Sequence, residues 1–176
     1  MIKKIPVRVI TISALLIATE IVLNRIISFN NLGLKIGFSF IPIIISAILF
    51  GPSVTALIYA VSDFIGALLL PIGPYFPGFT VCAALMGAVW GLFLYRGTDN
   101  KSKIKLFPNI IVPSLINNLF FGLIVNTIWI SIMYGSKSYW GWFVYRISEY
   151  AILIPLNIIF VPILVKLCDK LKKYVR

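Results

Sequence analysis

Ionisable side chains within apolar segments are the first candidates for chemistry in this sequence. Glu20, Arg25, Asp63, Arg146 and Glu149 interrupt runs that are otherwise hydrophobic. Because a charged group is costly at membrane depth, each of them needs a partner, either another side chain or a charged ligand. Arg146 and Glu149 are three residues apart on one helix face, so they either neutralise each other or present a charged pair to a ligand. Arg25 has no acid three or four residues away, and it either reaches the lipid headgroups or binds an anion.

The sequence lacks the side chains on which most catalytic and metal sites depend. It contains no histidine, and its two cysteines, Cys82 and Cys168, lie in or beside hydrophobic runs. It also has no phosphate-binding G-x-x-x-x-G-K-[ST] loop, no nucleophile elbow and no cluster of carboxylates at metal-ligand spacing. We therefore expect a binding protein and not an enzyme, without a metal or a cofactor. If the protein takes part in transport, the energy must come from elsewhere.

Aromatic and amide side chains form a second group of candidates. Tyr75 and Phe76 lie in a proline-rich segment that cannot be helical, which would hold the two rings over a planar ligand. Trp129 offers a further ring, whereas Trp140 and Trp142 fit the aromatic belt of a membrane surface. Amide groups inside apolar segments either join helices or bind a ligand. They belong to Asn117, Asn118, Asn126 and Asn157.

Six apolar segments with short connections must position these groups. The 176 residues are 60% hydrophobic and 12% charged, whereas soluble domains are about half apolar and a quarter charged. A transmembrane helix needs about 20 apolar residues, so six spans use most of the chain. The predicted spans are residues 7–28, 36–50, 53–70, 79–95, 108–133 and 143–167. We therefore predict an all-α integral membrane bundle of six transmembrane helices, with residues 1–176 forming a single substrate-binding domain embedded in the lipid bilayer.

Basic residues are concentrated on one side of this predicted bundle. Twelve of the sixteen lie in the N-terminal segment, the connection 96–107 and the C-terminal segment from Lys166. Loops rich in Lys and Arg stay in the cytoplasm. We therefore expect a multi-pass protein of the cell membrane with both termini in the cytoplasm. The formal net charge of +11 then reflects topology and not nucleic-acid binding.

Small residues recur every four positions in three of the predicted helices. They are Ala14 and Ala18, then Ala56 and Ala60, then Ala83, Gly87 and Gly91. Such faces allow the backbones of two helices to approach closely. Each of them either packs inside the bundle or docks a membrane partner.

Several of these features occur in an order that resembles the substrate-binding (S) components of energy-coupling factor (ECF) vitamin transporters. The shared elements are the AxxxA pattern of Ala14 and Ala18, the run Gly37-Phe38-Ser39-Phe40-Ile41-Pro42, and Phe50-Gly51-Pro52. Other motifs are similar to the folate-specific branch of the family. They are Tyr75-Phe76-Pro77-Gly78-Phe79-Thr80, Val125-Asn126-Thr127-Ile128-Trp129-Ile130-Ser131, and Arg146 ahead of Ile154-Pro155-Leu156-Asn157.

The resemblance implies a six-helix subunit that captures folate from outside the cell. Its first helix, through Ala14 and Ala18, would dock onto a transmembrane coupling protein that two ATPase subunits drive. Folate suits the candidate residues, because a pterin has a flat face for aromatic rings and an edge of donors and acceptors. The ring could be that of Tyr75, Phe76 or Trp129, and Asp63, Asn126 or Glu149 could bind the polar edge; Thr80 belongs to the same motif as Tyr75 and Phe76. The bases available for the two carboxylates of the glutamate tail are Arg25, Lys35 and Arg146.

One position departs from the family pattern, and two classes of protein outside the family are alternative interpretations of the sequence. After Arg146, where the pattern has a Lys-Asn pair, this sequence has Ser148-Glu149-Tyr150, so a carboxylate stands where a cation is usual. Within the family, the ligand is alternatively another vitamin or a precursor. A secondary transporter would show inverted repeats and interrupted helices, and a membrane enzyme would need catalytic groups; the sequence shows neither.

Overall fold

The computed structural model describes residues 6–31, 34–99, 107–135 and 138–175, and these residues are almost entirely helical. The first four helices are α1 (Val7–Arg25), α2 (Phe40–Phe50), α3 (Pro52–Leu69) and α4 (Pro77–Asp99). The next helical stretch is continuous from η1 (Phe107–Ile111) through α5 (Val112–Leu115) and η2 (Ile116–Val125) to α6 (Asn126–Tyr134). The last helix is α7 (Tyr139–Val175). The predicted all-α class with six helices is therefore confirmed.

Prolines and glycines set several of these helix boundaries. Pro52 and Pro77 are the first residues of α3 and α4, where the missing N–H of proline costs no helical hydrogen bond. Gly51 joins α2 to α3 with a φ of 81°, a conformation that favours glycine. Within α7, Pro155 and Pro162 are accommodated without ending the helix.

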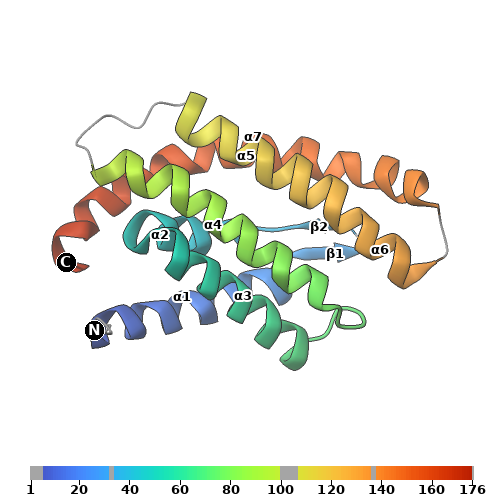
Figure 1. Ribbon diagram of the computed structural model, residues 1–176, viewed down its shortest axis with the longest axis horizontal. Coiled ribbons are helices and arrows are strands. Elements are labelled where there is room, and N and C mark those ends of the chain that lie inside the picture. Colours follow the sequence, from blue (N-terminus) through green and yellow to red (C-terminus); the bar gives the residue numbers. More distant parts are fainter. Residues whose placement is uncertain (1–5, 32–33, 100–106, 136–137, 176) are drawn as a thin grey trace.

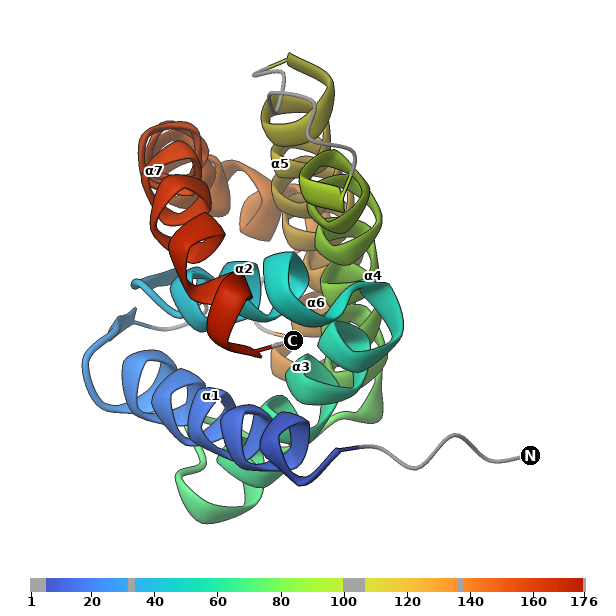
Figure 2. The same ribbon diagram turned by 90° about the vertical axis from the view of Figure 1, so that its left-hand side faces the viewer.

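Five of the helices are long and apolar enough to cross a membrane, and α2 is the exception. Its 11 residues extend about 16 Å at about 1.5 Å per residue, which is less than the hydrocarbon thickness of about 30 Å. This short helix lies in the middle of the bundle, where it contacts α1, α3, α4 and α7 (Figure 2).

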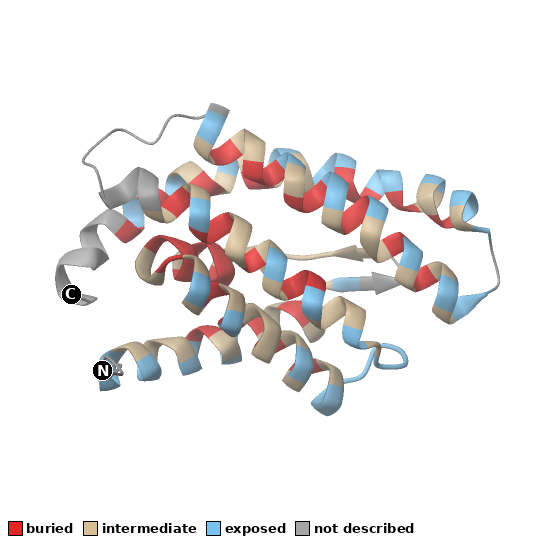
Figure 3. Ribbon diagram, in the orientation of Figure 1, coloured by how far each residue is buried: buried red, intermediate tan, exposed pale blue. Residues whose placement is uncertain are grey.

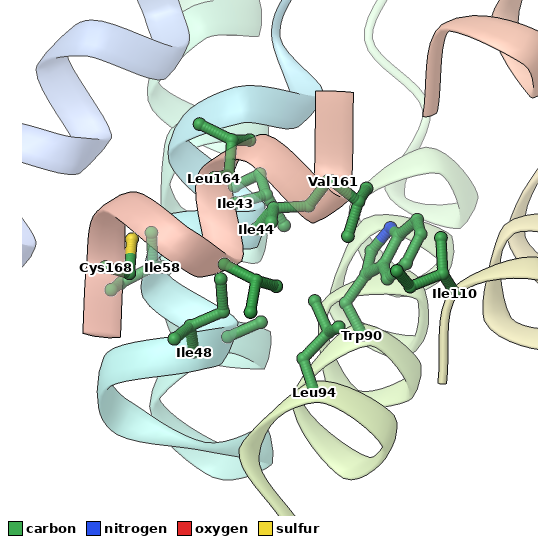
Figure 4. Packing of buried hydrophobic residues seen from close by; sticks show 12 residues of the cluster. Ile43, Ile44, Ile48, Ile58, Trp90, Leu94, Ile110, Val161, Leu164 and Cys168 are labelled. Carbon is green, nitrogen blue, oxygen red and sulfur yellow. The ribbon is translucent and has the colours of Figure 1, made fainter. Parts of the chain in front are cut away.

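The buried core is built around α2. Ile43, Ile44 and Ile48 are at most 1% exposed. They pack with Trp90 and Leu94 of α4 and with side chains of α3, η1 and α7 (Figure 4). Exposed residues instead lie along the outer sides of the long helices (Figure 3), as expected where the solvent is lipid.

A two-stranded antiparallel hairpin, which the sequence analysis did not predict, connects α1 to α2. Strand β1 (Phe29–Asn31) pairs with β2 (Leu34–Ile36), with Asn30 opposite Lys35. Only two residues separate the strands, which is the commonest length of a hairpin connection. The hairpin lies between the layers of helices (Figure 1) and contacts α7 through β2.

The beginning of α1 and the end of α7 lie at the same end of the molecule (Figure 1). The last turn of α1, the hairpin, the proline-rich loop after α3 and the first turns of α7 lie at the other end. Many of the basic residues on which the predicted orientation rests, such as Lys3, Lys4, Lys101, Lys103 and Lys105, lie outside the described residues.

The small-residue faces of α1 and α4 differ in their surroundings. A Cβ added at Gly87 would lie 2.8 Å from the carbonyl oxygen of Thr55, and one added at Gly91 would overlap the backbone of Pro52. The α4 face is therefore packed against the start of α3. Ala14 and Ala18 are both exposed, so the α1 face has no such contact within the described chain.

Candidate ligand-binding site

A cavity of about 490 Å³ lies at the end of the bundle away from the described chain ends. This volume is within the range of small-molecule sites, about 300 to 1,000 Å³. The wall comes from the end of α1, the hairpin, α2, α3, the proline-rich loop, α4, the η2 and α6 segments, and α7. Eight of the ten ligand-binding residues predicted from the sequence line it. They are Arg25, Lys35, Asp63, Tyr75, Phe76, Asn126, Arg146 and Glu149.

The two predicted residues that do not line the cavity, Thr80 and Trp129, support residues that do. Thr80 Oγ1 donates a hydrogen bond of 2.8 Å to Asp63 Oδ2 and lies 3.2 Å from the Tyr75 hydroxyl. The Trp129 ring packs against Phe76, with 5.1 Å between the ring centroids. Both contacts place the proline-rich loop against helices that carry cavity-lining side chains.

Arg25 and Asp63 form an ion pair between α1 and α3. Arg25 Nη2 lies 3.6 Å from Asp63 Oδ1, and the two side chains are 10% and 17% exposed. Arg25 Nε is buried without a hydrogen-bond partner. The guanidinium group is therefore only loosely neutralised. Sequence spacing could not indicate this pair, because the two residues are 38 positions apart.

Lys35 brings a second positive charge to the same part of the cavity. It is half-buried on β2, and among the described residues no acid lies within the 4.0 Å of an ion pair with it. Burial, followed by the charge of Arg25, lowers the pKa of Lys35 to about 8. The acids Glu20, Asp63 and Glu149 oppose this shift without cancelling it. An anion bound beside Lys35 would relieve the repulsion between the two bases.

Arg146 and Glu149 also pair with each other, on α7, the helix that contacts β2. Arg146 Nε donates to Glu149 Oε2 over 3.2 Å, and both side chains are at most 5% exposed. The structure therefore shows the mutual pairing that the sequence left open. Since both residues also line the cavity, the pairing does not remove them from the site.

The inner part of the wall contains residues that the sequence analysis missed. On α3, Tyr59 and Ala67 lie one turn before and one turn after Asp63; on α4, Met86 and Trp90 continue a line that starts at Phe79. The signal that would have found them is helical spacing from Asp63, since residues four apart share a face.

The aromatic residues near the start of α7 divide between two environments. Trp140 is 70% exposed, as a surface belt requires. Trp142 is 3% exposed, and its ring lies 5.8 Å from that of Tyr134. The expectation of a belt position is therefore wrong for Trp142, because the start of α7 turns this side chain toward the end of α6. Elsewhere, the described residues contain no group of three potential metal ligands.

Comparison with known proteins relates the whole bundle to one group of membrane proteins. Residues 8–165 match the family model "ECF transporter, substrate-specific component". A protein named folate transporter FolT from Clostridium novyi is 35% identical over 166 residues, which cover 94% of this chain and 92% of that protein. A second folate transporter FolT, from Leuconostoc mesenteroides, is 31% identical over 160 residues, covering 91% of this chain and 82% of that protein.

A solved structure has a similar fold. The crystal structure of FolT bound with folic acid superposes with a TM-score of 0.79 at 33% sequence identity, and the match covers 89% of this chain and 90% of that chain. This coverage includes most of the helices that form the cavity.

Proposed function

Because this chain belongs to the family of substrate-specific components of ECF transporters, we propose that it captures folate in the cavity described above. The observation that carries the proposal is the similarity, over nearly the whole chain, to a FolT structure that contains folic acid. The composition of the cavity supports it, since bases, acids, amides and aromatic rings line one space of suitable volume.

The parts of folate match different groups in the cavity wall. A pterin ring and its polar edge suit Phe76, Tyr75 and the oxygen and nitrogen atoms of Asn126. Asp63 and Glu149 are the two acids available to accept hydrogen bonds from ligand N–H groups. The carboxylates of the glutamate tail would face the positive charges of the cavity, where charge-assisted hydrogen bonds are about twice as strong as neutral ones.

We further propose six spans, with both termini in the cytoplasm and the cavity open to the outside of the cell membrane. The described ends of the chain lie together at the end away from the cavity (Figure 1). In the sequence, most basic residues belong to the N-terminal segment, the connection 96–107 and the C-terminal segment, as expected for cytoplasmic segments. The α2 helix would form the remaining span, and the hairpin would connect it to α1 on the outer side.

The exposed Ala14 and Ala18 face of α1 is the proposed docking surface for the transmembrane coupling protein. The sequence has no ATP-binding loop, so uptake would depend on that protein and its two ATPase subunits. The bundle itself would supply the binding site.

The direct test is mass spectrometry of small molecules released from the protein purified in detergent, followed by calorimetric titration with folate. We expect a folate in the released fraction and one binding site per chain. Release of a different vitamin or precursor, with no heat from folate, would instead support an S component of other specificity.

Reconstituted vesicles separate an S component from a secondary transporter. The purified chain alone should bind folate without accumulating it, and accumulation should require the coupling protein, the ATPases and ATP. Accumulation driven by an ion gradient in vesicles that contain only this chain would contradict the proposal.

A further inference from the structure

Arg146 differs from the other bases of the cavity because the protein itself occupies its guanidinium group. Nε donates to Glu149 Oε2 over 3.2 Å, Nη1 donates to the Gly122 carbonyl over 3.2 Å and to Thr127 Oγ1 over 3.1 Å, and Nη2 donates to the Tyr150 hydroxyl over 2.6 Å. All three nitrogens are engaged, and the residue is 4% exposed. Of the five donors of a guanidinium group, at least four point at protein atoms.

These contacts join two walls of the cavity. Glu149 and Tyr150 belong to α7, as does Arg146, whereas Gly122 lies in the π-helical segment η2 and Thr127 lies in the first turn of α6. π-Helical turns are rare and occur frequently at functional sites. The η2 segment contributes cavity-lining residues. They are Asn117, Asn118 and Gly122, with Asn126 immediately after the segment.

The packing around Gly122 shows how closely the two walls approach. A Cβ at this position would lie 2.6 Å from Cε1 of the Tyr150 ring, so only glycine fits without a shift. The carbonyl of the same glycine accepts the hydrogen bond from Arg146 Nη1. The guanidinium group, the Tyr150 ring and the π-helical backbone form one buried joint.

Arg25 and Lys35 present the opposite situation. Arg25 has a single ion pair, at 3.6 Å, and an Nε without a partner. Lys35 has no acid within ion-pair distance among the described residues. Two adjacent positive charges with few protein partners are suited to a ligand that carries two carboxylates.

We propose that Arg146 is a positioning residue that fixes the π-helical wall against α7, and that Arg25 and Lys35 are the bases that bind the carboxylates of the ligand. The inference rests on the proposed function, since those carboxylates belong to the glutamate tail of folate. It divides between two roles the three bases that the sequence analysis treated as equivalent.

The experiment compares two ligands by calorimetric titration of the purified full chain. One is folate, and the other is the N-methylamide of pteroic acid, which keeps the pterin and the aminobenzoyl amide but has no carboxylate. R146Q should weaken both ligands by the same factor, about tenfold or more, because buried partners lose their hydrogen bonds. R25Q and K35Q should weaken folate by a similar factor and leave the amide unchanged.

R146K separates positioning from charge. Lysine keeps the positive charge but lacks the planar fork that reaches four partners, so we expect the loss seen for R146Q with both ligands. The binding stoichiometry should stay near one per chain while Kd rises. A fall in stoichiometry with unchanged Kd would show that Arg146 only maintains folding, and it would overturn the positioning role.

T127V provides a test that leaves every charge in place. Thr127 is fully buried and does not line the cavity. Its replacement by valine removes one hydrogen bond of Arg146, which should weaken the binding of both ligands equally, by about threefold. The inference is wrong if T127V binds both ligands as the wild type does, or if R146Q or R146K loses folate but keeps the amide. Failure of the wild type to bind either ligand would instead refute the proposed function.

Discussion

At the scale of single residues, one threonine connects the proline-rich loop to the charged part of the cavity. Thr80 bonds Asp63 and contacts the Tyr75 hydroxyl, while Asp63 pairs with Arg25. The ring of Phe76, the residue after Tyr75, packs against Trp129. The loop is therefore fixed from two sides, which holds its two rings in the wall of the cavity.

Replacing Tyr75 and Phe76 together with alanine should weaken folate binding. The lost aromatic contacts are worth at least about 1 kcal/mol, which corresponds to about a fivefold rise in Kd, measured by calorimetric titration. Trp140→Ala is the matched control, because that ring is 70% exposed and does not line the cavity. Equal affinity for the double variant and the wild type would show that the two rings do not cover the ligand.

Lys35 should make folate binding depend on pH. Its pKa is lowered to about 8 by burial and by Arg25, in spite of Glu20, Asp63 and Glu149 nearby. Only the protonated ammonium group attracts a carboxylate, so affinity should be steady below about pH 7 and should fall as the pH rises through 8 to 9. The measurement is Kd against pH.

Lys35→Arg is the control for that titration, because a guanidinium group stays protonated throughout this range. Because both proteins bind the same ligand, the comparison of their pH profiles also removes any effect of ionisation of the ligand. The decline between pH 7 and 9 should therefore be smaller in K35R than in the wild type. Superimposable pH profiles would mean that Lys35 does not contact the ligand.

At the scale of elements, α1 has two opposite faces. Its buried residues, Leu16, Glu20 and Asn24, are spaced by four. Ala14 and Ala18 are each two positions before one of them, which corresponds to about 200° around a helix. The helix that pairs Arg25 with Asp63 at the cavity therefore turns its small-residue face away from the bundle.

Substituting tryptophan for both Ala14 and Ala18 should leave folate binding by the isolated subunit intact. The larger side chains should prevent close approach of a partner helix, so co-purification with the coupling protein and ATP-dependent uptake should both be lost. A variant that fails to fold or to bind would show that this face packs inside the bundle. A variant that assembles and transports normally would exclude docking at these positions.

Gly91→Ala should lower the stability of the fold without removing the binding site. The added Cβ would overlap the backbone of Pro52 at the start of α3, and overpacking of this kind costs about 1 to 3 kcal/mol. We expect a lower midpoint of thermal unfolding in detergent, with folate binding retained in the folded fraction. Unchanged thermal stability would mean that α3 and α4 are less closely packed than described.

Helices were predictable from the sequence because their signals are local. Pro52, Pro77 and Gly51 mark boundaries, and long apolar runs need no tertiary information. The hairpin was missed because its strands have three residues each, too few for an alternating pattern. The π-helical segment was also missed, and its contact with Arg146 through the Gly122 carbonyl joins residues 24 positions apart.

The composition of the site was predictable in part for the same reason. Charged and aromatic residues in apolar surroundings are conspicuous, and most of those selected line the cavity. Their partners were not predictable, because Arg25 meets Asp63 and Trp129 meets Phe76 only when separate helices come together. Trp142 was placed wrongly because the direction of a side chain near the start of a helix depends on the neighbouring helix.

At the scale of the whole molecule, the proposed orientation can be tested with introduced cysteines. The starts of α7 and α3 lie toward opposite ends of the bundle (Figure 1). Ser138, just before α7, and Ser53, in the first turn of α3, are both exposed. In intact cells, Ser138→Cys should react with a membrane-impermeant maleimide and Ser53→Cys should not. The wild type is the control, since Cys82 and Cys168 are buried. The reverse labelling would place the cavity on the cytoplasmic side.

The shortness of α2 has a consequence for the membrane potential. If the cavity opens outward as proposed, the ligand lies above a barrier only about 16 Å long, so the whole voltage drops across about half of the usual distance. The ligand above this barrier stays close to the outside potential, whereas moving its two negative charges through the barrier against an inside-negative potential of 100 mV would cost about 4.6 kcal/mol. The membrane potential would therefore oppose release of folate into the cell much more than its capture.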